Sequence, residues 1–160
     1  MTLQQDLLPP CLTLSFILWE YPTENMRRLL SILLIWAFLK HRHKVRSYLN
    51  NQEDLKPLFC EVDLVLMPSR TDGFGLTGLE ALSAVLPVII SKNSGFGEAL
   101  GSALCGSLFV VNSEDPSDWR KAIKDIWDKD RKKQLEEVKD VRGSYSKEYS
   151  WSKQCEIKSY

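Results

Sequence analysis

The sequence predicts an α/β fold in which helices cover both faces of a parallel β-sheet. From Val45 onward, short aliphatic runs alternate with longer amphipathic stretches, as in strand–helix–strand units. The aliphatic runs are nearly continuous, which is typical of strands buried on both faces. Polar, glycine-containing loops follow several of them, and such loops end a strand and start a helix.

Each expected element follows from local composition. A short strand is expected at residues 44–48, and three largely apolar runs predict strands at residues 63–67, 88–91 and 107–111. The stretches between and after them predict helices at residues 52–60, 76–84, 97–100 and 116–127. Asn50 or Asn51 is the expected N-cap of the first helix, and Asp115 is the expected N-cap before Pro116.

The C-terminal part is expected to be helical but interrupted. Charges of both signs alternate over residues 129–141, which predicts a solvent-facing helix. Gly143 is expected to break this helix, and Tyr149 is expected to open a last short helix.

Length and composition narrow the class of protein. The 160 residues suffice for one domain, and 21 basic and 21 acidic residues give a formal net charge of zero. No global field therefore attracts nucleic acid or an anionic membrane. The four cysteines show no metal-binding spacing, so we expect no metal; Cys60 and Cys105 are expected to be core residues of a cytoplasmic protein.

Residues 1–44 differ from the remainder and are treated as a separate N-terminal segment, with one domain at 45–160. Two apolar runs occur at residues 7–19 and 29–39. The second has 11 uncharged residues, fewer than the roughly 20 needed to span a bilayer. A buried helix, or a sequence that replaced the usual first half of the domain, is favoured over an interfacial membrane anchor.

The turn that follows the expected strand at residues 63–67 carries the clearest functional signal. Gly73, Phe74 and Gly75 lie between this strand and the next helix, and Asp72 and Glu80 bracket them. Backbone amides at the start of a helix bind phosphate, and carboxylates accept hydrogen bonds from hydroxyls. These groups together indicate a nucleotide-sugar site. The loops at residues 91–97 and 112–115 also follow strands and are expected on the same edge of the sheet.

The chain resembles the C-terminal, nucleotide-sugar-binding domain of retaining glycosyltransferases of the GT-B fold (group 1, family 4). The motifs that carry the resemblance are Pro68–Leu82, Leu86-Pro87-Val88-Ile89 and Gly95-Phe96-Gly97-Glu98-Ala99. It implies a Rossmann-like sheet, a nucleotide-diphosphate donor such as a UDP- or GDP-sugar, transfer to a hydroxyl acceptor with retention, and no obligatory metal.

The resemblance also implies a role for each site residue. Asp72 stands where the family has a catalytic Glu beside the transferred sugar, and Glu80 stands where a second Glu binds the ribose hydroxyls. The remaining donor-binding residues that it implies are Arg70, Gly73, Phe74, Gly75, Leu76, Gly95 and Glu98. For Arg70 a pair with Asp72 is the alternative, for Asp72 a turn hydrogen bond, and for Glu98 a capping role.

Three departures from the family pattern shape the expected function. Val85 replaces a glycine, and if that position needs positive φ it is strained. The basic pair that neutralises the diphosphate has no counterpart, and the acceptor-binding N-terminal domain is absent from the sequence. We therefore expect a truncated glycosyltransferase of weak or no activity. The alternative is a non-catalytic interaction module that keeps the fold.

Overall fold

The computed structural model describes residues 15–17, 44–46, 55–68 and 73–150. Within this part of the chain, strands β3 (Val65–Met67), β4 (Val88–Ser91) and β5 (Val110–Val111) form a parallel sheet in that order. Strands β1 (Ser15–Ile17) and β2 (Lys44–Arg46) form a second parallel pair, and β1 lies within 8 Å of β3. The described part is thus an α/β fold with parallel strands.

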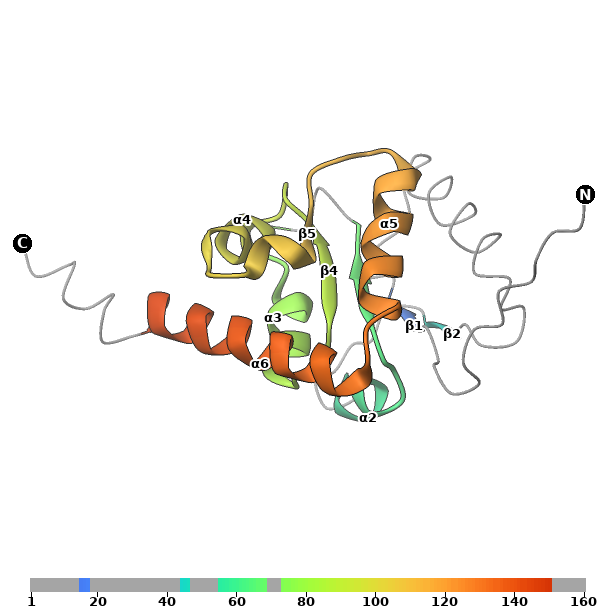
Figure 1. Cartoon of the computed structure of the whole chain (residues 1–160), viewed down its shortest axis with the longest axis horizontal. Helices are drawn as coiled ribbons and strands as arrows, with labels where there is room; N and C mark the ends of the chain where they lie inside the picture. Colours follow the sequence, from blue (N-terminus) through green and yellow to red (C-terminus); the bar gives the residue numbers. More distant parts are fainter. Residues whose placement is uncertain (1–14, 18–43, 47–54, 69–72, 151–160) are drawn as a thin grey trace, which may run out of the picture.

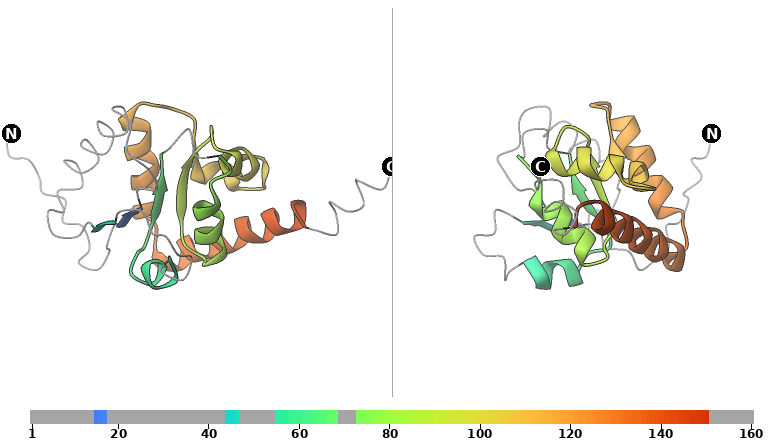
Figure 2. Two further views of the ribbon diagram at one scale, coloured as in Figure 1. Left: turned by 180° about the vertical axis from the view of Figure 1, so that it is seen from behind. Right: turned by 90° about the vertical axis from the view of Figure 1, so that its left-hand side faces the viewer.

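Helices lie on both sides of the three-stranded sheet. Figures 1 and 2 show α3 (Leu76–Ser83), α4 (Gly95–Ser102) and α6 (Arg131–Glu148) on one side, and α5 (Pro116–Trp127) on the other. Helix α2 (Leu55–Cys60) lies at the amino end of β3, and the 3-10 helix η2 (Gly106–Phe109) leads into β5. This arrangement leaves the carboxyl ends of the strands as the edge where the connecting loops gather.

The core explains why these residues form these elements. Every residue of β3 and β4 is buried, so both strands are apolar throughout instead of alternating. Their register pairs Val65 with Val88 and Met67 with Ile90. The largest buried side chains come from both helical layers, with Trp119 of α5 on one side and Phe96 of α4 on the other. Since no polar residue of β3 or β4 faces water, only the strand ends can hold a site.

Local capping sets the ends of two helices. Asp115 accepts a hydrogen bond from the Ser117 amide at 2.9 Å, with Pro116 in the first helical position, which confirms the N-cap expected for α5. The same backbone hydrogen bond, with a second from the Ser117 side chain, lowers the pKa of Asp115. Asp130 caps α6 in the same way through the Lys132 amide, at 3.1 Å.

The strand expected at residues 107–111 is wrong for its first part. Residues Gly106–Phe109 form a 3-10 helix, and only Val110–Val111 pair with β4. The chain passes so close to the end of α4 that a Cβ on Gly106 would overlap the Leu100 carbonyl oxygen. This close approach is a tertiary contact, and it replaces the extended conformation that the local sequence favours.

The break expected at Gly143 is also wrong, because α6 continues through it to Glu148. Gly143 is exposed, with open space around its Cα among the described residues. Val138 and Val141 before it and Tyr145 after it are buried on one face of the helix, and their burial outweighs a glycine penalty of about 1 kcal/mol. Tyr149 is the C-cap of α6 and does not open a new helix at that position.

The two cysteines expected in the core are exposed free thiols. Cys60 is the last residue of α2, where the helix leaves the core. Cys105 has a left-handed backbone, with φ of 63°, in the turn before η2. Apolar neighbours in sequence therefore predicted burial wrongly at both positions. Among the described helices, none is both long enough and apolar enough to cross a bilayer.

Val85 has positive φ, as its replacement of a glycine suggested. Helix α3 ends with two backbone hydrogen bonds, from Val85 to Leu82 and from Leu86 to Ala81, both at 3.0 Å. This pattern places Val85 at the position after the C-cap, where φ is 60°. Glycine is preferred there because a β-branched side chain is strained in the left-handed region.

Replacing Val85 by glycine is expected to stabilise the protein. Relief of the left-handed strain exceeds the added chain entropy of glycine and the lost packing of a half-buried side chain, leaving a gain of about 1 kcal/mol. Urea unfolding monitored by circular dichroism measures it. Val85→Ala, which keeps a Cβ but removes the branch, should gain less, and a Val85→Gly protein less stable than wild type would contradict the assignment.

Replacing Gly143 by alanine is expected to raise the free energy of unfolding by about 0.5–1 kcal/mol. The new methyl group meets open space among the described residues, so only the helix propensity changes. Thermal unfolding at fixed pH tests this, with Ser146→Ala on the same exposed helix as a control that should change stability by less. A loss of stability in Gly143→Ala would show that the helix bends or packs differently at this residue.

Candidate functional site

Gly75 is required by the backbone of the turn that follows β3. It is the N-cap of α3 and lies in the left-handed region, with φ of 86° and ψ of 48°. A Cβ there would also lie 3.5 Å from Ile90 Cδ1 and 3.6 Å from Phe96 Cβ. Gly73 is different, because among the described residues nothing lies within 4 Å of its hypothetical Cβ. Gly75 thus sets the backbone conformation of the turn, and the space beside Gly73 is open among the described residues.

The start of α4 holds this turn through two backbone hydrogen bonds. The Gly95 amide donates to the Gly73 carbonyl at 3.1 Å, and the Phe96 amide donates to the Phe74 carbonyl at 2.5 Å. Gly95 permits the approach, because a Cβ there would lie 3.1 Å from Phe74 Cδ2. The two predicted loops are therefore joined directly. The amide of Gly95 is occupied by this contact and is not available to a phosphate.

The amides of the turn that are assigned to phosphate binding do not point toward α4. In a trans peptide the carbonyl and the following N–H are antiparallel, so the N–H groups of Phe74 and Gly75 point away from α4. Among the described residues, no acceptor is recorded for the amides of Phe74, Gly75 or Leu76. Phe74 and Leu76 are exposed whereas Gly75 between them is buried, so only part of this turn lies at the surface. These are the amides of the three residues that the resemblance implies for donor binding, and that role stays a prediction.

The second loop is fixed by buried serines. Ser94 is the N-cap of α4, where its Oγ accepts from the Gly97 amide and donates to the Ser91 carbonyl, both at 3.0 Å. The capping role that was the alternative for Glu98 thus belongs to Ser94. Glu98 is exposed in the first turn of α4, where a negative charge suits the helix dipole. Its predicted contact with the donor stays a prediction.

Of the two carboxylates that bracket the turn in sequence, Asp72 and Glu80, the structure describes only Glu80. Glu80 lies in the second turn of α3 and is half-buried. Its neighbours Ala81 and Leu82 are buried in the core, so the helix turns Glu80 only partly toward solvent. Asp72, assigned as the catalytic residue, and Arg70 lie outside the described residues. Gly73 to Leu76, Glu80 and the start of α4 are therefore the part of the predicted site that the structure places.

A chain of aromatic rings links α6 to the glycine turn. Ring centroids are 6.1 Å apart for Phe74 and Phe96, 5.4 Å for Phe96 and Tyr145, and 4.7 Å for Tyr145 and Tyr149. The Tyr149 hydroxyl lies 3.0 Å from Ser102 Oγ on α4. Burial raises the pKa of Tyr145, and nearby Tyr149 raises it further, so the hydroxyl stays neutral at physiological pH. The rings pack α6 behind the turn.

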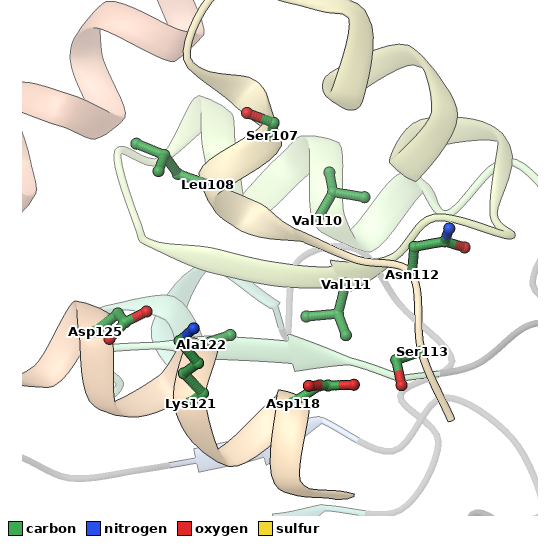
Figure 3. Close-up of a pocket in the computed structure, with 10 residues that line it drawn as sticks. All are labelled: Ser107, Leu108, Val110, Val111, Asn112, Ser113, Asp118, Lys121, Ala122 and Asp125. Carbon is green, nitrogen blue, oxygen red and sulfur yellow. The ribbon is translucent and has the colours of Figure 1, made fainter. Parts of the chain in front are cut away.

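The loop after β5 borders a groove of about 400 Å³, shown in Figure 3. Polar and apolar side chains line it, and they come from η2, β5, the loop after β5 and α5. The lining residues are Ser107, Leu108, Val110, Val111, Asn112, Ser113, Asp118, Lys121, Ala122 and Asp125. Asn112 and Ser113 come from the loop expected at this edge. No group of three or more His, Cys, Asp or Glu residues with metal-binding geometry occurs within the described ranges.

Sequence reasoning missed one residue on this edge, Lys92. It directly follows β4, its side chain is exposed, and its amide donates to the Val111 carbonyl at 2.9 Å. The only sequence signal was its position immediately after an apolar run, which does not by itself separate a binding lysine from a solvated one.

Comparison with known proteins gives a consistent picture. A family model described as "Family 4 Glycosyltransferase in conflict systems" matches residues 12–157. A D-inositol 3-phosphate glycosyltransferase of Paenarthrobacter aurescens is 29% identical over 104 residues, which cover 65% of this chain and 24% of that protein. An O-antigen chain mannosyltransferase of Salmonella typhimurium is 37% identical over 73 residues, or 46% of this chain and 20% of that protein. The match thus spans between a fifth and a quarter of the length of these curated relatives.

Two solved structures are similar in fold. The C-terminal domain of a glycosyl transferase group 1 family protein from Francisella tularensis has a TM-score of 0.59 and 16% identity, covering 80% of this chain and 64% of that one. The N-terminal domain of Candida albicans trehalose-6-phosphate phosphatase has a TM-score of 0.60 and 19% identity, covering 91% and 34%. Both support the Rossmann-like α/β fold. The domain boundary expected at residue 44 stays a prediction.

Replacing Gly97 by alanine is expected to destabilise the protein by about 1–3 kcal/mol. The added Cβ would overlap the Ser91 carbonyl oxygen, and backbone cannot move aside as a flexible side chain can. Gly101→Ala on the same helix is the matched control, since its Cβ would meet Val110 Cγ2 at an ordinary 3.9 Å. Urea unfolding of both variants measures the difference, and equal stabilities would contradict the described packing of α4 on β4.

Proposed function

The chain belongs to the family 4 glycosyltransferases in conflict systems, and we propose that it forms the donor-binding part of a retaining glycosyltransferase. In this proposal the carboxyl edge of the sheet binds a nucleotide-diphosphate sugar such as a UDP- or GDP-sugar. The glycosyl group passes to a hydroxyl acceptor with retention. The observation that carries the proposal is the left-handed Gly75 turn at the start of α3.

This turn suits a diphosphate for a physical reason. The amides of Phe74, Gly75 and Leu76 lie at the positive end of the α3 dipole, and no described acceptor uses them. The hydrogen bonds from α4 hold the turn in place before a ligand arrives. Preorganised donors stabilise the charge of a departing diphosphate without reorganisation, and basic side chains, not a metal ion, are proposed to complete the stabilisation.

Glu80 is proposed to bind the ribose hydroxyls. It is on α3, whose first turn carries the phosphate-binding amides, and it is half-buried. A carboxylate that accepts two hydroxyl hydrogen bonds distinguishes ribose from deoxyribose. Asp72 is proposed to lie beside the transferred sugar and to stabilise positive charge at its anomeric carbon. Asp is one methylene shorter than Glu, and its reach therefore limits the rate of transfer.

Catalysis needs groups from outside the described edge. The acceptor side of the site is proposed to come from another domain, because one sheet edge cannot surround a donor and exclude water. On its own the chain is proposed to bind donor and to transfer weakly or not at all. The exposed free thiols Cys60 and Cys105 support a cytoplasmic, reducing location.

A non-catalytic interaction module is the second candidate. Leu104, just before η2, is 75% exposed, and Leu108, within η2, is 54% exposed. Apolar side chains gathered at a surface favour contact with a partner. Such a module would keep the fold without binding nucleotide. Binding of a nucleoside diphosphate therefore separates the two candidates.

Glu80→Ala is expected to weaken binding of UDP or GDP about tenfold, because hydrogen bonds to a charged group contribute about 1.5–3 kcal/mol. Calorimetry with the ribonucleotide and its 2′-deoxy analogue sharpens the test. Wild-type protein should prefer the ribonucleotide, and Glu80→Ala should bind both equally. Glu136→Ala, at an exposed position of α6, is the matched control and should behave as wild type. Equal heats from all three proteins, or no heat from any, would remove the assignment.

A further inference from the structure

We propose that Lys92 provides the cation that neutralises the donor's diphosphate. This inference rests on the proposed function, since it assigns a further binding residue to the same site. It concerns a residue that directly follows the middle strand of the β3-β4-β5 sheet.

Backbone hydrogen bonding places Lys92 at the carboxyl edge. Its amide donates to the Val111 carbonyl at 2.9 Å, which closes the Ser91–Val111 pair at the end of the ladder between β4 and β5, and Lys92 itself begins the turn that follows. Lys92 therefore stands between the loop that follows β3 and the loop that follows β5. Ligands of parallel sheets bind beyond this edge.

The end of β4 that precedes Lys92 packs against the glycine turn. The side chains of Met67 and Ile90, paired across β3 and β4, both approach Gly75: their ends would lie 3.8 and 3.5 Å from its hypothetical Cβ. Lys92 follows Ile90 by two residues, where β4 has ended and the loop toward α4 begins. It is therefore close along the chain to the residue that packs on the turn, and its flexible side chain is exposed there.

The two loops are also tied together at this place. Three residues after Lys92, the Gly95 amide bonds to the Gly73 carbonyl, and the Phe96 amide bonds to the Phe74 carbonyl. A long, flexible lysine at the head of one loop therefore lies next to the turn formed by the other. It can follow a phosphate bound at that turn without any change in the backbone.

The charges of the edge single out Lys92. Among the described residues of the loops that follow β3, β4 and β5, it is the one basic side chain, whereas the loop after β5 contains Glu114 and Asp115. No ion pair of Lys92 is recorded within the described ranges. Lys121 borders the nearby groove, but Asp118 and Asp125 flank it one turn away on either side, as Figure 3 shows. The charge of Lys92 is the better placed for an anion.

Lys92→Gln is expected to weaken binding of the nucleoside diphosphate about three- to tenfold while leaving the uncharged nucleoside unaffected. Calorimetry with UDP, UMP and uridine, or the guanine series if wild type prefers it, measures this at two salt concentrations. The variant should also lose part of the salt dependence of diphosphate binding, because one screened charge is gone. Lys92→Arg should restore affinity, since it keeps the charge.

Lys124→Gln is the matched control, as an exposed lysine on α5, and should bind like wild type. Equal diphosphate affinity of Lys92→Gln and wild type at low salt would overturn the inference and leave the proposed function standing. An equal loss for uridine and UDP would also overturn it, because it would show a structural role. If wild type binds no nucleotide, the proposed function fails first and takes this inference with it.

Discussion

The pair of backbone hydrogen bonds between the glycine turn and the start of α4 is the constraint on which the site depends. It joins two loops that leave neighbouring strands, and it uses the carbonyls of Gly73 and Phe74 so that the following amides face the other way. Gly95 allows the loops to touch, and the buried Ser94 fixes the first turn of α4. A ligand at this turn meets donors whose direction was set by folding.

Side-chain packing connects this pair of hydrogen bonds to α6, the last helix that the structure describes. Phe96 donates its amide to the turn and also packs its ring on Tyr145 of α6. The same residue therefore couples the hydrogen bonds of the site to the hydrophobic core. The helix must run through Gly143 to place Tyr145 there, which explains why an exposed glycine does not end it. Local helix propensity loses to a buried aromatic contact at this position.

Sequence predicted the elements whose cause is local. The strand at residues 88–91 and the helix at 116–127 have the expected ends, because an uninterrupted buried run and an Asp–Pro cap define them. The requirement for glycine at position 75 was readable from a strand–glycine–helix pattern. Tertiary causes were not readable: the close approach at Gly106 shortened β5, and no local pattern shows that the Gly95 amide donates to the Gly73 carbonyl. Lys92 was overlooked because only the order of the strands shows that it stands between the loops that follow β3 and β5.

Binding and transfer are separable in such an arrangement. In the proposed function, the glycine turn and α3 hold the diphosphate through fixed amides, and this needs no second domain because the donors are already oriented. Transfer needs more: the departing diphosphate must be neutralised, water must be excluded and an acceptor must approach the anomeric carbon. An open sheet edge meets the first of these conditions at most. A chain that keeps the glycines of the turn can therefore retain affinity for a nucleotide even where the rate of glycosyl transfer is low, because the interactions that bind the ground state are not those that stabilise the transition state.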